Sequence, residues 1–191
     1  MQKVLAVFLF CCFAPWRLCA SEPVRILIAT DKGDIEAELY AAQAPVTVAN
    51  FLRYVDGHLY DGGRFHRTVT PTNQPDNKIK IEVIQAGPDS AKKELPPIKL
   101  ERTRDTKVAH KDGTLSMARD GPDTATGDFF ICIGDQPELD YGGKRNLDGQ
   151  GFAAFGRVTK GMDVVRAIQA SPADGQTLKP AIRIMSVSRR P

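Results

Sequence analysis

The chain has 191 residues, the size of one ordinary domain. Hydrophobic residues make up 42% of it and charged residues 26%, and these shares exclude both a membrane-embedded protein and an intrinsically disordered one. The formal net charge is +3, with both signs mixed along the sequence. The sequence therefore has no basic patch that would indicate a nucleic acid or a membrane surface as a partner.

The first twenty residues have the layout of a secretory signal peptide. Lys3 precedes an uncharged apolar run over 4–16, and the small residue Ala20 offers a cleavage site. The run is shorter than the roughly 20 apolar residues that a membrane-spanning helix needs. We therefore predict a signal peptide over 1–20 and an exported domain over 21–191. This domain would be periplasmic or secreted, without stable membrane insertion after cleavage.

Two other interpretations of this segment stay open. It could remain attached as an uncleaved anchor, or it could carry a lipid at Cys19, although the bulky Leu18 disfavours the second. Cleavage would leave Cys132 as the one cysteine of the mature domain and would exclude an internal disulfide. It would also reduce the basic residues from 26 to 24 against 23 acidic ones, for a net charge of +1. We expect the mature domain to be a monomer.

The first predicted elements of the domain are a hairpin and a helix. Apolar residues alternate over 24–28 and 35–39, and the intervening Asp31-Lys32-Gly33-Asp34 suits a tight turn, so these segments predict a β-hairpin. Residues 45–56 begin with a proline and carry apolar residues at helical spacing up to Gly57. They predict one amphipathic helix.

The rest of the chain is typical of an all-β architecture. Glycine, proline, aspartate and asparagine clusters separate short apolar runs at 64–69, 79–85, 113–118, 129–133 and 152–158. A second short helix is predicted after Gly161, and a final strand over 181–188. The polar segments 70–78 and 86–112 are predicted to be surface loops.

The usual signatures of enzyme chemistry are missing from the sequence. It has no Walker loop, dinucleotide-binding glycine pattern, GxSxG elbow or HExxH motif. With only His58, His66 and His110 and one cysteine in the predicted mature domain, a zinc site is hard to assemble. We expect neither a metal nor a cofactor.

Five short motifs identify a family resemblance. In chain order they are Phe65-His66-Arg67, the IQAG of 84–87, the GTLSMAR of 113–119, the DFFI of 128–131 and the FAAFG of 152–156. Together they resemble the cyclophilin-type peptidyl-prolyl cis/trans isomerases, including exported bacterial members. The resemblance implies an all-β fold, a closed eight-stranded antiparallel barrel capped by two helices, with the site on the outer barrel wall.

The reaction of this family explains why the sequence carries so little catalytic equipment. Rotation of an X-Pro bond breaks amide resonance, a barrier of about 20 kcal/mol, but it makes no new bond. The process needs a donor for the prolyl nitrogen and a pocket for the proline ring. Arg67 stands at the position of the family's catalytic arginine, and its permanent charge and forked donors suit that role. The alternative is an ordinary surface arginine in a salt bridge.

The resemblance also implies a set of substrate-binding residues. Phe65 would pack at the base of the site, and an apolar pocket would receive the proline ring. Gln85 would hydrogen-bond the peptide backbone and steady Arg67, while the backbone of Ala118 and Arg119 would support the extended substrate. By strand alternation Phe129 is expected in the core and Phe130 in the pocket. The full predicted set is Phe65, Val83, Gln85, Ala118, Arg119, Asp128, Phe130, Leu139 and Phe152.

Several positions depart from the best-known family members. Asp128 replaces a glutamine and is expected to form a charge-assisted pair with Arg67. Arg119, Glu138 and Phe152 replace asparagine, an aromatic residue, and histidine or tyrosine. The interval between Arg67 and Gln85 is longer than in the family, so an inserted loop over 70–80 is predicted beside the site. Its polar residues would contact substrate or serve only as loop residues: Thr72, Asn73, Gln74 and Asn77.

These observations predict an enzyme that accelerates X-Pro rotation in exported proline-containing polypeptides and so assists their folding. The alternative is a non-catalytic chaperone or scaffold module that binds proline peptides without turnover. A third interpretation is a surface component whose barrel presents the loops 70–78 and 86–112 to a partner protein.

Overall fold

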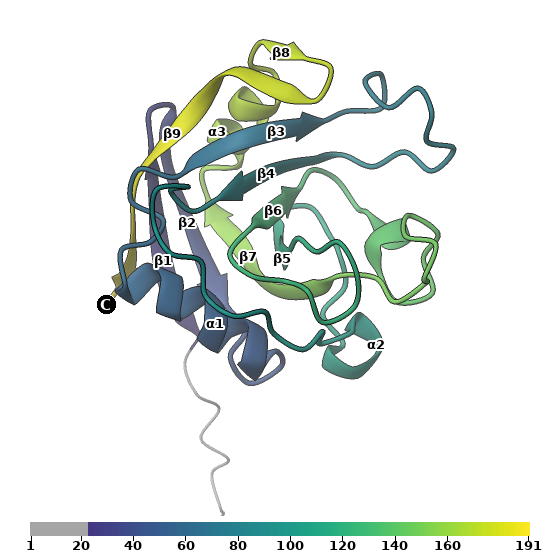
Figure 1. Cartoon of the computed structure of the whole chain (residues 1–191), viewed down its shortest axis with the longest axis horizontal. Helices are drawn as coiled ribbons and strands as arrows, with labels where there is room; N and C mark the ends of the chain where they lie inside the picture. The colour runs from purple at the N-terminus through teal and green to yellow at the C-terminus, as the bar shows by residue number, and fades with distance from the viewer. Residues whose placement is uncertain (1–22) are drawn as a thin grey trace, which may run out of the picture.

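The computed structural model describes residues 23–191 (Figure 1). The predicted signal peptide, 1–20, lies outside the described residues. Within the described part, no helix is long and apolar enough to cross a membrane.

Nine strands and three α-helices make up this part of the chain (Figure 1). The strands are β1 Val24–Thr30, β2 Gly33–Leu39, β3 Arg64–Val69, β4 Val83–Gly87, β5 Thr114–Met117, β6 Phe129–Cys132, β7 Ala153–Lys160, β8 Ala173–Asp174 and β9 Thr177–Arg190. The helices are α1 Pro45–Asp56, α2 Thr103–Thr106 and α3 Met162–Gln169, with one 3-10 turn, η1, at Pro137–Leu139.

Eight of the strands close into a barrel. They follow the order β1-β2-β7-β5-β6-β4-β3-β9, every pairing is antiparallel, and β9 pairs back onto β1. The two-residue β8 forms only a short hairpin with β9. Closure satisfies the backbone of the outermost strands. The predicted barrel is therefore confirmed, as is the antiparallel pairing of its strands.

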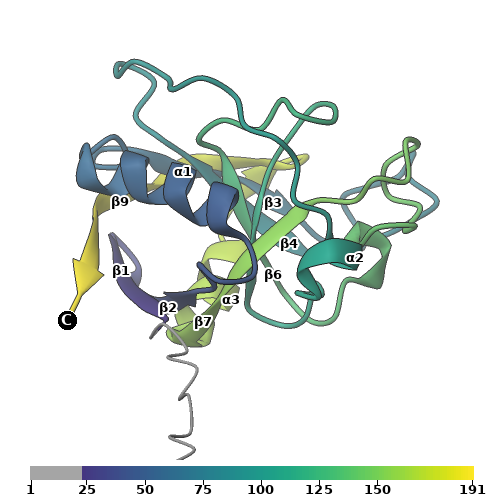
Figure 2. The ribbon, with the colours of Figure 1, turned by 90° about the horizontal axis from the view of Figure 1, so that it is seen from below.

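The hairpin and the helix predicted from the sequence are both present. β1 and β2 pair from Val24 with Leu39 to Thr30 with Gly33, and Gly33 takes a positive φ of 128° in the turn. α1 begins at the predicted Pro45 and ends at Asp56. Figure 2 shows α1 and α3 on opposite sides of the barrel. The third helix, α2, was not expected, because four residues within a polar loop are too few to give a helical pattern.

Buried apolar side chains form two separate clusters. The larger one fills the barrel, with Phe51, Phe65, Phe129 and Phe155 among its members. The smaller one lies on the outer wall and consists of Val69, Ile81, Val83, Phe130, Cys132 and Leu139, with Ala118 and Phe152 packed against it. Strand β6 supplies both clusters, because its successive side chains point to opposite faces. We call the second group the outer apolar cluster.

Candidate active site

A β-bulge in strand β3 sets the direction of Arg67. Phe65 pairs with Ala86 of β4, but Arg67 pairs with the very next residue, Gln85, so His66 is the extra residue. In a regular strand Phe65 and Arg67 would point to the same face. The bulge turns them to opposite faces, with Phe65 inside the barrel and Arg67 outside.

This geometry corrects the expectation that Phe65 lies at the substrate site. Its side chain is fully buried in the barrel core, and its ring centroid lies 6.0 Å from that of Phe129 in an edge contact. It supports the barrel wall from within and does not line the pocket described next.

A pocket of about 460 Å³ lies on the outer wall. It brings together every other residue of the predicted site: Arg67, Val83, Gln85, Ala118, Arg119, Asp128, Phe130, Leu139 and Phe152. The remaining lining residues were not expected from the sequence: Ile81, Glu94, Asp120, Thr124, Thr126, Arg145 and Asn146. The pocket therefore joins an apolar floor to a charged and polar rim.

Two glutamines hold the guanidinium of Arg67. Its Nη1 donates to Gln85 Oε1 at 3.0 Å, while Nε and Nη2 both donate to Gln176 Oε1, at 2.9 and 2.6 Å. Gln176 Nε2 in turn donates to the Asn73 carbonyl at 3.1 Å. Burial lowers the pKa of Arg67, but a guanidinium stays cationic at physiological pH. Neutral acceptors thus fix its orientation without cancelling its charge.

The predicted pair between Asp128 and Arg67 is wrong, because Gln85 lies between them. Gln85 Nε2 donates to Asp128 Oδ2 at 3.0 Å while its Oε1 accepts from Arg67, and no ion pair joins the two charges in the described structure. His66 Nε2 lies 3.6 Å from Asp128 Oδ2. The amide of Gln85 is therefore oriented from both ends.

Burial raises the pKa of Asp128, although the hydrogen bond from Gln85 and the nearby His66 act in the opposite direction. Because the raised pKa means that the folded state holds the proton more tightly than the unfolded chain, this group favours folding at low pH. That contribution is lost as the pH rises through the folded-state pKa.

We therefore expect Asp128→Asn to raise the melting temperature at pH 7 by about 1–3 °C, a modest shift because the side chain is 38% exposed. The difference should disappear below about pH 4, where aspartates of the unfolded chain are protonated. Thermal melts from pH 3 to 8 measure it, with Asp31→Asn in the exposed β1–β2 turn as the control for loss of one surface charge. An Asp128→Asn protein less stable than wild type at pH 7 would contradict this expectation.

The outer apolar cluster gives the pocket its floor. The Phe130 ring meets Phe152 edge-on, with centroids 5.3 Å apart, and is stacked on His110 at 6.0 Å. His110 is itself fixed, since Nδ1 lies 2.7 Å from Asp140 Oδ1 and Nε2 lies 2.9 Å from Ser116 Oγ. The aromatic floor is thus held rigidly from behind.

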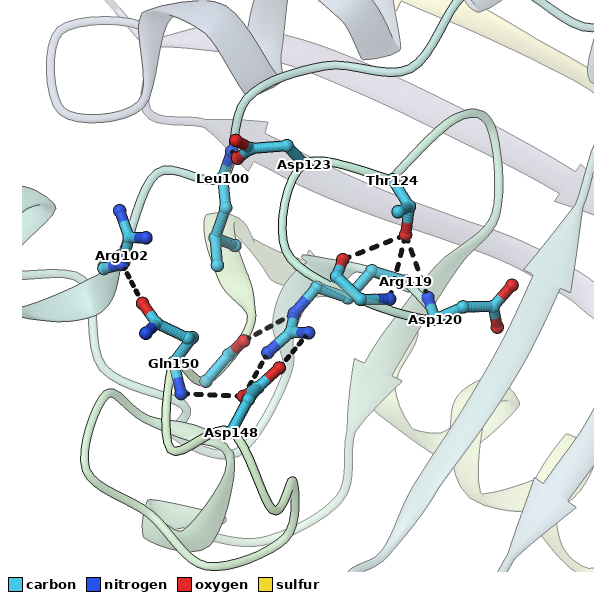
Figure 3. A network of polar contacts seen from close by, with 10 residues as sticks. Leu100, Arg102, Arg119, Asp120, Asp123, Thr124, Asp148 and Gln150 are labelled. Carbon is cyan, nitrogen blue, oxygen red and sulfur yellow. Dashed lines mark hydrogen bonds and ion pairs between the residues drawn. The ribbon is translucent and has the colours of Figure 1, made fainter.

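The side chain of Arg119 is committed to a loop contact (Figure 3). Its two terminal nitrogens donate to Asp148 at 2.7 and 2.9 Å, its Nε donates to the Gly151 carbonyl at 2.8 Å, and only 1% of the side chain is exposed. The guanidinium carbon also lies 5.2 Å from the centroid of the Phe152 ring. Arg119 therefore holds Phe152 and its loop in place. Its side chain is not free to contact a substrate, but the backbone of Ala118 and Arg119 is.

The polar residues of the predicted insertion do not line the pocket. Asn73 Nδ2 donates to the carbonyls of Thr68 and Gly175, at 3.0 and 3.1 Å. Gln74 is buried, and its Nε2 donates to the carbonyls of Thr70 and Ile81. These two residues tie the loop to the barrel and to the segment that carries Gln176.

Comparisons with known proteins agree with this geometry. A family model described as "Cyclophilin type peptidyl-prolyl cis-trans isomerase/CLD" matches residues 25–189. The chain is 35% identical to peptidyl-prolyl cis-trans isomerase A of Dickeya dadantii over 169 residues, covering 88% of this chain and 82% of that protein. It is 41% identical to peptidyl-prolyl cis-trans isomerase cyp18 of Streptomyces antibioticus over 145 residues, covering 73% of this chain and 80% of that protein.

A solved structure supports the fold. A cyclophilin-type peptidyl-prolyl cis-trans isomerase of Cryptosporidium parvum superposes with a TM-score of 0.71 at 22% identity, covering 88% of this chain and 98% of that chain. The chain belongs to the cyclophilin family, and it is a peptidyl-prolyl cis/trans isomerase.

The pocket suits rotation about an X-Pro bond. As the bond twists, resonance is lost and the lone pair of the prolyl nitrogen becomes able to accept a hydrogen bond. Arg67 keeps a hydrogen on each terminal nitrogen that no contact among residues 23–191 engages, and the guanidinium lines the pocket. A fixed cationic donor stabilises the twisted state more than the planar one, while the apolar floor holds the proline ring.

Gln176, which no motif of the sequence marks as a site residue, accepts two of the three hydrogen bonds that hold Arg67. We expect Gln176→Ala to lower kcat/KM by about tenfold, because the loss of a hydrogen bond to a charged group costs about 1.5 kcal/mol or more. The measurement is NMR exchange on an Ala-Pro peptide. Asp174→Asn, on the same hairpin but paired with Lys179, should keep the wild-type rate. Equal rates for Gln176→Ala and wild type would show that Gln85 alone orients the guanidinium.

Proposed function

We propose that this isomerase acts on exported polypeptides and assists their folding outside the cytoplasm, in the periplasm or after secretion. The arginine held beside an apolar pocket supports turnover of X-Pro bonds in extended chains. A cyclophilin-type isomerase of Cryptosporidium parvum was crystallised in the presence of the dipeptide Ala-Pro, which supports proline peptides as the substrate class. The signal-like segment at 1–20 supports export.

The observation that carries the proposed activity is the position of Arg67 relative to the pocket floor. Arg67 and Phe130 project from different strands, β3 and β6, onto the same outer face, where both line one pocket. A proline ring on Phe130 would therefore present its nitrogen toward a guanidinium that Gln85 and Gln176 already orient. No bond has to be made or broken at this site.

Activity is tested by NMR exchange between the cis and trans forms of an Ala-Pro peptide, with and without the purified protein. Accelerated exchange supports the enzyme. Binding of the peptide without accelerated exchange would instead support the non-catalytic module. A second assay follows the refolding of a protein whose slow phase is an X-Pro isomerisation, since such phases last tens of seconds and are easily resolved.

The export part of the proposal has its own test. The full chain and a chain lacking residues 1–20 are produced in the same Gram-negative host, and the periplasmic, cytoplasmic and culture fractions are assayed for the protein. Export of the full chain alone supports the proposal. Retention of both chains in the cytoplasm would overturn export while leaving the isomerase activity intact.

A further inference from the structure

Three arginines line the pocket: Arg67, Arg119, which is paired with Asp148, and Arg145. Arg145 lies in the segment between η1 and β7, and its half-buried side chain faces the same 460 Å³ pocket. Its Nη1 donates to Gln74 Oε1 and to the Ile79 carbonyl, both at 2.8 Å. Its backbone N–H donates to the Glu138 carbonyl at 3.1 Å. Both the side chain and the backbone of Arg145 are therefore fixed in place.

The anchor of Arg145 comes from the inserted loop. Gln74 is buried, and its Nε2 donates to the carbonyls of Thr70 and Ile81. These two hydrogen bonds orient the amide so that its Oε1 accepts from Arg145. Figure 1 shows the β3–β4 connection, which carries this loop, projecting from the barrel. The pocket lining includes none of the polar loop residues Thr72, Asn73, Gln74 and Asn77. The loop nevertheless holds the cationic side chain of Arg145 in the pocket.

The guanidinium of Arg145 has no carboxylate partner in the described part of the chain. Neither Arg145 nor Arg67 forms an ion pair within residues 23–191. The pKa of Arg145 is lowered by burial and by the charge of Arg67, as expected for two cations that share one cavity. Three acidic residues also line the pocket: Glu94, Asp120 and Asp128. They gather around Asp128, whose pKa is raised by burial and further by the charges of Glu94 and Asp120, whereas the charge that acts on Arg145 is that of Arg67.

Two like charges in one partly buried pocket repel each other, so keeping them there favours a ligand that carries the opposite charge. The acceptors that hold them, Gln74, Gln85, Gln176 and a backbone carbonyl, are all neutral. A guanidinium held in this way binds a carboxylate through short charge-assisted hydrogen bonds. The free donors of Arg145 thus define a site for an acidic side chain beside the proline.

We propose that Arg145 is a specificity-determining residue, which binds an aspartate or glutamate directly before or after the isomerising proline. This inference rests on the proposed isomerase function and names its preferred substrate class, acidic X-Pro or Pro-X sequences. Gln74 acts as the positioning residue, because it fixes Arg145 without lining the pocket.

The test compares matched peptides that differ by one charge. Exchange is measured by NMR for a Glu-Pro peptide against Gln-Pro, and for Pro-Glu against Pro-Gln, with Ala-Pro as reference. In at least one pair the wild-type protein should favour the glutamate peptide about tenfold in kcat/KM, mainly through KM. The preference should shrink as salt is raised from low to about 0.5 M, because salt screens the attraction.

In the variant Arg145→Gln, the ratio of kcat/KM for the glutamate peptide to kcat/KM for the glutamine peptide should be close to one. Lys144→Gln is the matched control, since it removes the same charge from the neighbouring exposed residue, and it should keep the wild-type ratio. Gln74→Ala should reduce the ratio partly. Circular dichroism and thermal melts confirm that each variant is folded, and the ratio corrects for any general loss of activity.

Two outcomes would overturn the inference: a ratio near one in both wild-type pairs, or an unchanged ratio in folded Arg145→Gln. Failure of the isomerase assignment is separate, because then the wild-type protein would not accelerate exchange of the Ala-Pro peptide at all.

Discussion

Replacing Arg67 with alanine is expected to lower kcat/KM for X-Pro exchange by about 10²–10³-fold, the usual effect of removing one oriented donor from a transition state. The two glutamines that hold Arg67 cannot replace it. Gln85 and Gln176 both accept from Arg67, so after truncation they would present oxygens where a donor is needed. The rate is measured by NMR exchange on an Ala-Pro peptide.

Arg67→Lys separates charge from geometry. Lysine keeps a cation but cannot reproduce the forked contacts with Gln85 and Gln176, so most of the loss should remain. Because Arg67 lies on the outer wall and not in the barrel core, both variants should keep the wild-type circular dichroism spectrum. A folded Arg67→Ala protein with the wild-type rate would refute the central role of this arginine.

The second large effect concerns stability. Phe129→Ala is expected to lower the free energy of unfolding by about 3–5 kcal/mol, the cost of emptying a well-packed aromatic site. The Phe129 ring is fully buried and meets three others edge-on, with centroids 5.4 Å from Phe51, 5.5 Å from Tyr60 and 6.0 Å from Phe65. These rings come from α1, the following loop and β3, so the cavity would loosen several elements at once. Urea unfolding followed by circular dichroism measures the change.

Phe130→Ala is the matched comparison, because the same side chain is removed one position along the same strand. Phe130 belongs to the outer apolar cluster and lines the pocket. Its loss should lower kcat/KM by about 10–50-fold, since the contact of three proline methylenes with the ring contributes about 2 kcal/mol. Phe129→Ala should keep the rate per folded molecule within a few fold. Equal effects of both variants on the rate would contradict the division between core and site.

Much of the fold could be predicted from local patterns. The hairpin of β1 and β2 follows from alternating residues around Gly33, and α1 from the segment between Pro45 and Gly57. The closed barrel itself came from the family resemblance. The bulge at His66 could not be predicted, because it depends on how β3 pairs with β4. Without the bulge, alternation would put Phe65 and Arg67 on one face, so the bulge is what sends Phe65 into the core and away from the substrate site that the resemblance implied for it.

The parts of the site that escaped prediction are those that distant segments supply. Gln176 is 109 residues from Arg67 in the sequence and reaches it only because β9 pairs with β3. Arg145 is aimed at the pocket by Gln74, 71 residues away. The expected partner of Asp128 was also wrong, because the family resemblance implies that Gln85 and Asp128 both belong to the site but does not show that the Gln85 amide lies between the charges of Asp128 and Arg67.

The place of β9 in the barrel has a consequence for when the enzyme becomes active. β9 pairs with both β1 and β3, and the turn that leads into it carries Gln176. A chain that emerges from its amino end during synthesis thus lacks both the closing strand and the side chain of Gln176 that holds Arg67 until residues 176–190 appear. We therefore expect the barrel to close, and isomerase activity to appear, only after the last strand has been made.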